Sequence, residues 1–330
     1  MILNEKLANK KPMVSISMLT YNHEKYIEQA IKSVLMQEVD FDYQLIIGED
    51  CSTDNTRNIV IKYAQAYPDK IIAILNDKNV GMKENSINVR RYLNGKYITA
   101  LEGDDFWTDK KKLAKQVVFL EKNLQYSAVA HKHYEVNENG NKITGEKLRE
   151  YSTGYSKTNI YTIKEVEKYY LAAHTATILY KNFYKTLSRK QIYYYNNNDI
   201  VGDRKLNLVL AYLGGIYKFN EYMSAYRHHS KSWTEKARVG GLAFYGYQII
   251  PKLNSLAYDM FGIKLNFREG RMRCWYGTCI ELLKNCNSDN YHAVKMIFND
   301  GNKLKKFIYL FTHTLSYPVR ILLRSINYER

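Results

Sequence analysis

Cysteine is scarce in this sequence, and closely paired cysteines are absent. The 330 residues include only Cys51, Cys274, Cys279 and Cys286, and none of them belongs to a C-x-x-C pair. This usage argues against a disulfide framework and against a zinc site built from paired cysteines. It suits a reducing compartment.

Long apolar runs are missing as well. No segment reaches the roughly 18 apolar residues that a membrane-spanning helix needs. The first residues also lack the apolar core of a signal peptide. We therefore expect a cytoplasmic protein, either free or associated with the inner face of the cell membrane.

Two glycine-rich phosphate-binding signatures are also absent. The chain has no G-x-G-x-x-G after its first predicted strand and no G-x-x-x-x-G-K-[ST] anywhere. The dinucleotide-binding fingerprint and the P-loop are therefore excluded as ways of holding a nucleotide.

The composition is that of a folded protein with excess positive charge. Hydrophobic residues make up 45% of the chain and charged residues 25%, which is ordinary for a globular protein. Lys and Arg number 49 against 33 Asp and Glu, a surplus of 16 positive charges. Such a surplus favours polyanionic partners: phosphorylated ligands, nucleic acid or an anionic membrane surface.

The most informative stretch spans residues 95–107. Residues 97–101 are mostly apolar, which predicts a strand. Three carboxylates follow it directly: Glu102, Asp104 and Asp105. Because like charges repel, such a cluster is costly without a cation, and carboxylate oxygens suit Mg²⁺ or Mn²⁺. Gly103 lets the backbone turn sharply, and we call residues 102–105 the carboxylate turn.

Strands and helices alternate through the first hundred residues. Predicted strands span residues 13–19, 43–48, 71–75 and 97–101. Helical patterns lie between them, the first with Asn22 as a candidate N-cap. This alternation predicts a mostly parallel sheet flanked by helices. Such sheets bind ligands at the carboxyl ends of their strands, so Thr20-Tyr21-Asn22, Glu49-Asp50 and the carboxylate turn should meet in one crevice.

Five segments in this order carry a family resemblance. They are Val14-Ser15-Ile16 through Thr20-Tyr21-Asn22, residues 26–37, Glu49 to Thr56, Asn79-Val80-Gly81, and residues 95–107. Together they resemble family 2 glycosyltransferases, which are nucleotide-sugar-dependent inverting enzymes with the GT-A fold. The resemblance extends from Met13 to about Trp233.

This resemblance implies an α/β, Rossmann-like GT-A catalytic domain over residues 1–234. Its nucleotide-sugar-binding half would span about 12–107 and its acceptor-binding half about 108–234. The remaining residues, 235–330, would form a C-terminal helical region.

The same resemblance implies roles for individual residues. Residues of the nucleotide-sugar site would be Thr20, Tyr21, Asn22, Glu49, Asp50, Asn79, Glu102, Gly103, Asp104 and Arg227. Asp104 and His229 would hold a divalent metal, Mn²⁺ or Mg²⁺. Glu102 stands where the family has the first aspartate of its D-x-D motif, which leaves open whether it contacts ribose or metal. Tyr21 would offer a stacking face to the base, and Asp50 a hydrogen-bond acceptor.

A further acid is expected to act as the general base. Asp203 begins an apolar helical pattern and best matches the family's position, where a helix N-terminus favours the ionised form. Simple N-capping is the alternative role, and Asp199 is the alternative carboxylate. Residues expected to support the site or touch the acceptor are Asp105, Trp107, His174, Asp199 and Trp233.

The C-terminal end combines basic and apolar residues between about 303 and 324. This pattern fits a helix in an anionic membrane interface, a homodimer contact or an ordinary core helix. The lysine run at residues 110–115 is typical of a solvated face.

The expected activity is metal-assisted, inverting transfer of a sugar to a saccharide or lipid-linked saccharide acceptor, as in surface polysaccharide assembly. Nucleic acid is not expected as a partner, because the acids at the strand ends would repel phosphate unless a metal intervened. One alternative is a sugar-1-phosphate nucleotidyltransferase. Such an enzyme should show a glycine-rich phosphate loop near its first strand, which residues 17–22 do not supply.

Another alternative is a catalytically inactive nucleotide-sugar-binding or scaffold protein, which is suggested by glutamate at position 102.

Overall fold

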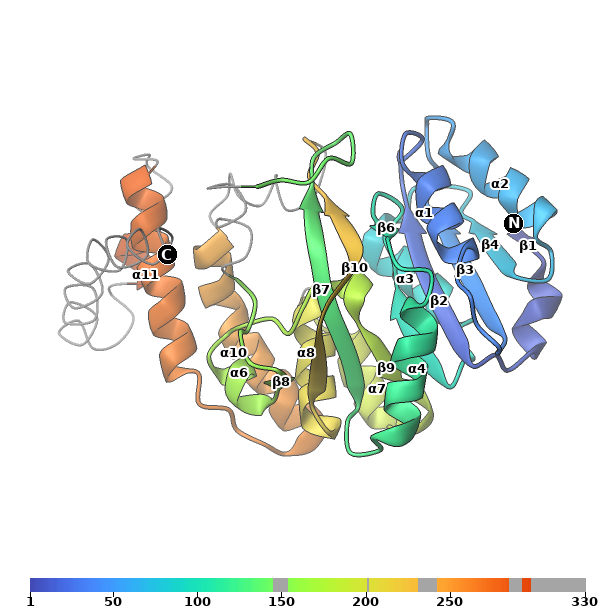
Figure 1. The fold of residues 1–330 in the computed structure, drawn as a ribbon. Coiled ribbons are helices and arrows are strands. Elements are labelled where there is room, and N and C mark those ends of the chain that lie inside the picture. The colour runs from blue at the N-terminus through green and yellow to red at the C-terminus, as the bar shows by residue number, and fades with distance from the viewer. Residues whose placement is uncertain (145–153, 201, 231–241, 285–292, 298–330) are drawn as a thin grey trace, which may run out of the picture. The chain divides into compact units, whose positions relative to one another are not determined.

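A computed structural model describes residues 1–144, 154–200, 202–230, 242–284 and 293–297 (Figure 1). The chain divides into two compact units. The first, which we call the sheet unit, contains residues 1–166, 171–193 and 201–229. The second, the helical unit, contains residues 167–170, 194–200 and those from 230 onward.

Four neighbouring parallel strands form the first half of the sheet (Figure 1). In spatial order they are β4 (Ile71–Leu75), β3 (Tyr43–Glu49), β2 (Val14–Thr20) and β5 (Tyr97–Ala100). Thr20 pairs with Glu49, and Glu49 pairs with Leu75, so these carboxyl ends are level. The predicted parallel sheet is confirmed, and β1 (Ile2–Leu3) adds an antiparallel edge strand to β4.

Helices cover both faces of this half. One core joins apolar residues of β2, β3 and β4 to those of α1 (Ile27–Leu35), α2 (Thr56–Ala66) and α4 (Lys112–Lys122). A second core joins alternate residues of β3 and β4 to α3 (Gly81–Arg90) and η1 (Glu5–Asn9). Successive side chains of a strand point to opposite faces, so β3 and β4 are buried along their whole length. This burial explains their continuous apolar sequences.

The second half of the sheet is mixed. β9 (Leu179–Lys181) runs antiparallel to both β5 and β7 (Ala128–Val136), and β10 (Ile216–Arg227) runs parallel to β7. β6 (Phe106–Trp107) and β8 (Ile160–Tyr161) both pair antiparallel with β10. The connections contain α6 (Ile163–Glu167), η3 (Thr175–Thr177), η4 (Phe183–Lys185), α7 (Arg189–Asn196) and α8 (Gly202–Leu213). Because β6 follows the carboxylate turn directly, its pairing brings that turn to the carboxyl end of β10.

The helical unit is built on α10 (Leu242–Phe261) and α11 (Arg268–Lys284), which pack together. Trp275 and Cys279 of α11 form a small core with Ile297. The basic and apolar pattern at 303–324 lies outside the described residues. Within the described ranges, no helix combines the length and the hydropathy needed to cross a membrane.

The expected capping role of Asn22 is wrong. Helix α1 begins five residues later, and its N-cap position has no side-chain cap. Asn22 instead adopts a left-handed backbone with φ of 57°, and its side chain accepts a hydrogen bond from the backbone N–H of Thr53 (2.9 Å). Asn22 therefore ties the loop after β2 to the loop after β3.

The lysine run at residues 110–115 is not uniformly solvated. Lys110 is exposed and pairs with Glu38, as expected of a surface residue. Lys112 is fully buried, its ammonium lies 4.2 Å from the Trp107 ring centre, and burial lowers its pKa well below the usual range. Its Nζ donates a hydrogen bond to Gln116.

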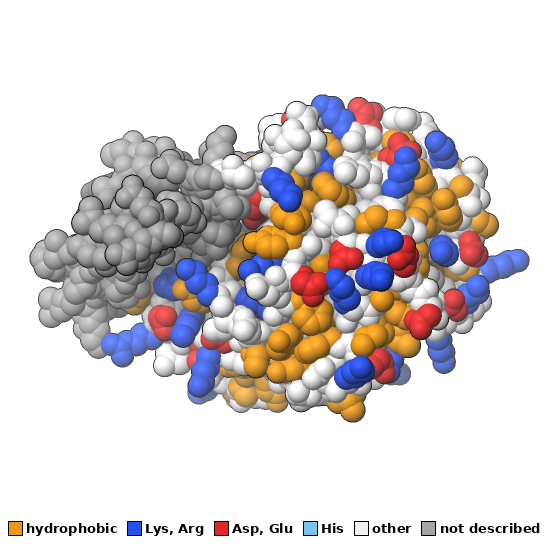
Figure 2. All heavy atoms as spheres, in the orientation of Figure 1, with side chains coloured by type: hydrophobic (Ala, Val, Ile, Leu, Met, Phe, Trp, Pro, Cys, Tyr) orange, Lys and Arg blue, Asp and Glu red, His pale blue; other side chains and the backbone are white. Residues whose placement is uncertain are grey.

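The surface charges of the sheet unit are mixed. Figure 2 shows Lys and Arg side chains interspersed with Asp and Glu on the face it presents. Ion pairs join Lys96 to Glu121 and Lys115 to Glu221. On this face, therefore, the surplus of basic residues is not gathered into one large patch.

Candidate active site

The carboxylate turn is held against the end of β2. The backbone N–H of Leu101 donates to the Ser17 carbonyl (2.9 Å), and that of Gly103 donates to the Leu19 carbonyl (3.0 Å). A Cβ at position 103 would lie 2.7 Å from Thr20 Oγ1 and 2.9 Å from His23 Nδ1. Glycine is required here because the turn passes so close to these side chains.

Asp104 lies between two imidazoles. The Nε2 atom of His229 is 2.9 Å from Asp104 Oδ2, and the Nε2 atom of His23 is 3.7 Å from the same oxygen. Burial opposes ionisation of Asp104, but the hydrogen bond from His229 and the nearby His23 outweigh it, so the pKa of Asp104 is lowered. A carboxylate oxygen beside an imidazole nitrogen is a donor set that fits Mn²⁺ better than Mg²⁺, which prefers oxygen ligands.

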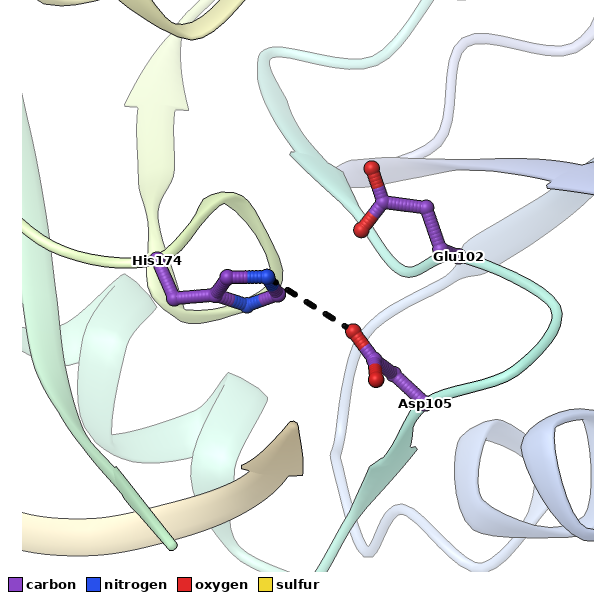
Figure 3. Close-up of side chains that lie close together, drawn as sticks. All are labelled: Glu102, Asp105 and His174. Carbon is purple, nitrogen blue, oxygen red and sulfur yellow. Dashed lines mark ion pairs between the residues drawn. The ribbon is translucent and has the colours of Figure 1, made fainter. Parts of the chain in front are cut away.

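A second group of potential ligands lies beside this pair (Figure 3). Single ligand atoms of Glu102, Asp105 and His174 all lie within 4.8 Å of one another, a spacing that a cation can bridge. Asp105 is only 1% exposed, and its Oδ1 accepts the backbone N–H of Arg227 (2.9 Å). Its Oδ2 has no hydrogen-bond partner and lies 3.7 Å from His174 Nε2.

Burial and neighbouring charges shift this second group toward its uncharged forms. Burial and the charges of Asp203 and Asp104 raise the pKa of Glu102 to about 8. Burial, Asp104 and Glu102 raise the pKa of Asp105 well above its usual range. Burial, with a smaller contribution from His133, lowers the pKa of His174 to about 3. At neutral pH Glu102 therefore retains its proton and the imidazole of His174 is uncharged.

The carboxylates, rather than the imidazoles, distinguish the two groups. The Nδ1 atom of His174 accepts the backbone N–H of Ala176 (3.4 Å), and the Nε2 atom of His229 lies within hydrogen-bond distance of Asp104, so each ring is hydrogen-bonded within the protein. The pKa of Asp104 is lowered, whereas that of Glu102 is raised to about 8. Because Asp104 is the ionised carboxylate, Asp104 and His229 are the better pair for the cation.

Asp203 lies in the first turn of α8. The hydroxyl of Thr175 donates a hydrogen bond to its Oδ1 (2.7 Å), and Asn207 Nδ2 donates to its backbone carbonyl (2.8 Å). Thr175 directly follows His174, whose Nε2 lies 3.7 Å from Asp105 Oδ2, so this hydrogen bond holds Asp203 on the same segment that faces the carboxylate turn.

Two acids at the carboxyl end of β3 bind the loops that follow β3 and β4. Glu49 is fully buried, accepts the backbone N–H of Ser52 (2.6 Å) and pairs with Arg57. Asp50 is also buried, and its two oxygens accept the backbone N–H groups of Val80 and Gly81, each at 2.9 Å.

The other predicted residues of the nucleotide side differ in exposure. Thr20 is buried, whereas Tyr21 and Asn79 are exposed at the crevice loops. The contacts of these residues with a nucleotide stay predictions.

Arg227 joins three parts of the sheet unit. It is 3% exposed, and each guanidinium nitrogen donates to a protein oxygen: Nε to the Asp104 carbonyl, Nη1 to the Glu138 carbonyl and Nη2 to Gln29 Oε1, at 2.7 to 2.8 Å. The guanidinium also lies 4.7 Å from the ring centre of Tyr26. Arg227 therefore ties the carboxylate turn to residues 29 and 138, and we call this arrangement the Arg227 clamp. The predicted contact of Arg227 with phosphate stays a prediction.

We expect Arg227→Met to destabilise the fold by about 3 kcal/mol or more, because the buried acceptors lose their donors and Asp105 loses a nearby positive charge. Urea unfolding measures this loss. The control is Lys110→Met, which removes an exposed ion pair and should change stability by less than about 1 kcal/mol. Equal effects of the two substitutions would contradict the clamp.

Three supporting residues lie in different surroundings. Trp107 is buried in the core, where its Nε1 donates to the Ala176 carbonyl (3.1 Å), so it supports η3. Asp199 is exposed and belongs to the helical unit. Trp233 lies outside the described residues.

Sequence reasoning missed several residues of this region. His23 directly follows the predicted Thr20-Tyr21-Asn22 segment, and this adjacency was its only signal. Glu135 accepts hydrogen bonds from His133 (3.0 Å) and His228 (2.7 Å), which outweigh the effect of burial and lower its pKa to about 2. The i, i+2 spacing of His133 and Glu135 on one strand face was the available signal.

Comparison with known proteins agrees with this architecture. Solved structures with a related fold include Staphylococcus aureus TarS 1–349 in complex with UDP-GlcNAc, with a TM-score of 0.62, 15% identity, and coverage of 88% of this chain and 80% of that chain. For the mannosyltransferase PcManGT from Pyrobaculum calidifontis, in complex with GDP-Man and Mn²⁺, the TM-score is 0.52 and the identity is 14%. The match covers 96% of this chain and 84% of that chain. The fold is the GT-A fold of glycosyltransferases.

The sequence profile described as "Glycosyl transferase family 2" matches residues 15–187, more than half of the chain. The chain belongs to this family.

Curated relatives are similar over part of their length. An uncharacterized glycosyltransferase of Methanocaldococcus jannaschii is 30% identical over 224 residues, which cover 66% of this chain and 71% of the relative. The Escherichia coli enzyme WfgD, a UDP-Glc:α-D-GlcNAc-diphosphoundecaprenol β-1,3-glucosyltransferase, is 29% identical over 145 residues, 44% of this chain and 54% of the relative. The match to uncharacterized Mycobacterium proteins, 36% identical over 129 residues, spans 37% of their length.

Proposed function

We propose that this protein is an inverting glycosyltransferase of surface polysaccharide assembly. It transfers a sugar from a nucleoside-diphosphate donor to a hydroxyl of a saccharide or lipid-linked saccharide. The observation that carries this proposal is the contact of His229 with Asp104, together with the hydrogen bond from Thr175 that holds Asp203 next to the His174 segment facing Asp105, at the carboxyl end of a parallel strand. The similarity to WfgD, whose name specifies a lipid-diphosphate-linked acceptor, supports this class of acceptor.

The donor occupies the crevice of the parallel strands. The exposed ring of Tyr21 offers the base a stacking face, and the loop held by Asp50 forms the adjoining wall. Asp104 and His229 hold a divalent cation, Mn²⁺ or Mg²⁺. When bound, such an ion offsets the charge that develops on the diphosphate leaving group.

Asp203 removes the proton from the acceptor hydroxyl. Thr175 fixes its Oδ1 by a hydrogen bond, so Oδ2 is the atom that takes the proton. The acceptor oxygen forms a bond to the anomeric carbon as the bond from that carbon to the diphosphate oxygen breaks, with the electron pair leaving on the diphosphate. One displacement of this kind inverts the anomeric configuration.

The proposed function assigns a role to each part of the chain. In this proposal residues 1–234 act as the catalytic domain, with a nucleotide-sugar-binding half at about 12–107 and an acceptor-binding half at about 108–234. Residues 235–330 are a separate C-terminal region that contains α10 and α11. Transfer to a lipid-linked acceptor would take place at the inner face of the cell membrane, where the basic C-terminal region would bind anionic lipid. A homodimer contact is the other role proposed for this region.

The test is hydrolysis of a panel of nucleotide sugars, including UDP-Glc, UDP-GlcNAc and GDP-Man, with Mn²⁺ or Mg²⁺. We expect slow release of nucleotide from one donor and loss of this release on addition of EDTA, because the cation is required for departure of the diphosphate. Calorimetry on the same panel is the control. Binding without cleavage, in the presence of saccharide acceptors, would favour an inactive nucleotide-sugar-binding protein, and no binding at all would contradict the proposed crevice.

A further inference from the structure

We propose that Glu135 is a positioning residue for residues 227–229, the segment that carries the metal ligand His229. This inference rests on the metal of the proposed function, and it adds a side chain from β7 that orients the ligand without binding the cation. Glu135 acts through His228, the residue directly before the ligand.

The side chains of this segment are held by two different parts of the sheet unit. Arg227 and His229 both contact Asp104: the Nε atom of Arg227 donates to its carbonyl (2.8 Å), and the Nε2 atom of His229 lies 2.9 Å from its Oδ2. His228 stands between them, and its Nε2 lies 2.7 Å from Glu135 Oε2. Its backbone N–H also donates to a carbonyl of β7 (2.8 Å). The neighbours of His228 therefore contact the carboxylate turn, whereas His228 itself is anchored to β7.

The carboxylate of Glu135 is itself fixed in place. Glu135 is 5% exposed, and while its Oε2 contacts His228, its Oε1 lies 3.0 Å from the Nε2 atom of His133. His133 and Glu135 are two residues apart on one strand, so their side chains share a face of β7. Hydrogen bonds to a charged carboxylate are stronger than those between neutral groups. A side chain bonded through both oxygens therefore gives the ring of His228 a defined orientation.

The position of these polar residues along β7 points to the site. Residues 128–130 at the start of the strand are buried and apolar, as a core strand requires, whereas its other end carries His133 and Glu135. Buried charged networks can often be replaced by apolar side chains without loss of stability, so stability alone does not explain a carboxylate held by two imidazoles. Glu135 pairs with Tyr226 of β10 in the parallel register. The polar end of β7 thus lies beside the strand end that leads into His228.

The experiment titrates Mn²⁺ into the full-length protein and follows the free ion by electron paramagnetic resonance. His228→Asn lacks an atom at the Nε2 position, and Glu135→Met keeps the length of the side chain but has no acceptor oxygen, so each substitution removes the bond between the two residues. We expect each variant to bind Mn²⁺ about tenfold more weakly than the wild type, because groups that orient a metal ligand contribute this much to affinity. Circular dichroism at the temperature of the titration establishes that each variant is folded.

The matched control is His133→Asn, which removes the other hydrogen bond of the same carboxylate and leaves the one to His228. It should bind Mn²⁺ with the affinity of the wild type. An equal loss of affinity in His133→Asn would show that Glu135 only stabilises the fold, and wild-type affinity in His228→Asn would overturn the positioning role while leaving the proposed metal intact. If Glu135→Met does not fold, the comparison of His228→Asn with His133→Asn still decides. Absence of Mn²⁺ binding by the wild type, with or without UDP or GDP, would contradict the metal of the proposed function itself, and the role of Glu135 with it.

Discussion

Asp104→Asn is expected to lower the rate of nucleotide release from the cleaved donor by about 10³-fold. A bound divalent ion contributes several kcal/mol to the stabilisation of a leaving phosphate, and each 1.4 kcal/mol corresponds to about tenfold in rate. Asparagine keeps the size of Asp104 and an oxygen for the His229 hydrogen bond, but it removes the charge that binds the ion. The measurement is the initial rate of nucleotide release as a function of Mn²⁺ concentration, in wild type and variant.

The matched control is Asp69→Asn, which removes the same charge from an exposed position. Asp69 precedes the amino-terminal end of β4, whereas the carboxylate turn follows the carboxyl end of β5. The rate of Asp69→Asn should equal that of the wild type. The lowered pKa of Asp104 means that its ionised form stabilises the fold at neutral pH, so the melting temperature of Asp104→Asn should fall somewhat. The rates are therefore compared at a temperature at which circular dichroism shows that both proteins are folded. Wild-type rates in Asp104→Asn would show that the ion is held elsewhere.

The donor half of the sheet could be predicted from the sequence for a definite physical reason. Parallel strands covered on both faces must be apolar throughout, so residues 43–49 and 71–75 are distinct from the amphipathic helices between them. The polar residues that end these strands then share one edge of the sheet. For this reason the sequence could predict that the ends of residues 13–19, 43–48 and 71–75 lie level at one edge of the sheet.

What could not be predicted depends on contacts between distant segments. The hydrogen bonds of Arg227 link it to residues near 29, 104 and 138, and no local pattern in the sequence records these partners. The burial of Lys112 could not be predicted either. Its ammonium contacts the Trp107 ring and Gln116, and helical periodicity does not reveal these contacts. Asn22 was expected to cap a helix because asparagine favours N-cap positions. In the structure its side chain accepts a hydrogen bond from the backbone N–H of Thr53 in the loop after β3.

Asp203→Asn is expected to lower the rate of sugar transfer to the acceptor by about 10²- to 10⁴-fold, the range that a positioned general base supplies. Asparagine retains an oxygen to accept the Thr175 hydrogen bond, so the geometry of α8 should be kept while the ability to take a proton is lost. In the proposed mechanism the donor is bound by residues after β2 and β3, which Asp203 is not proposed to contact. Its KM and its slow hydrolysis by water should therefore change much less than transfer does.

This difference between transfer and hydrolysis separates a base from a helix cap. A residue that only capped α8 would, when replaced, lower the melting temperature and affect transfer and hydrolysis together. The decisive comparison is Asp199→Asn, which neutralises the alternative carboxylate and should leave transfer at the wild-type rate. If Asp199→Asn loses transfer and Asp203→Asn retains it, the proton acceptor is Asp199. If both variants retain transfer, neither acid is the base, and deprotonation of the acceptor must be assigned to another group beside Glu102.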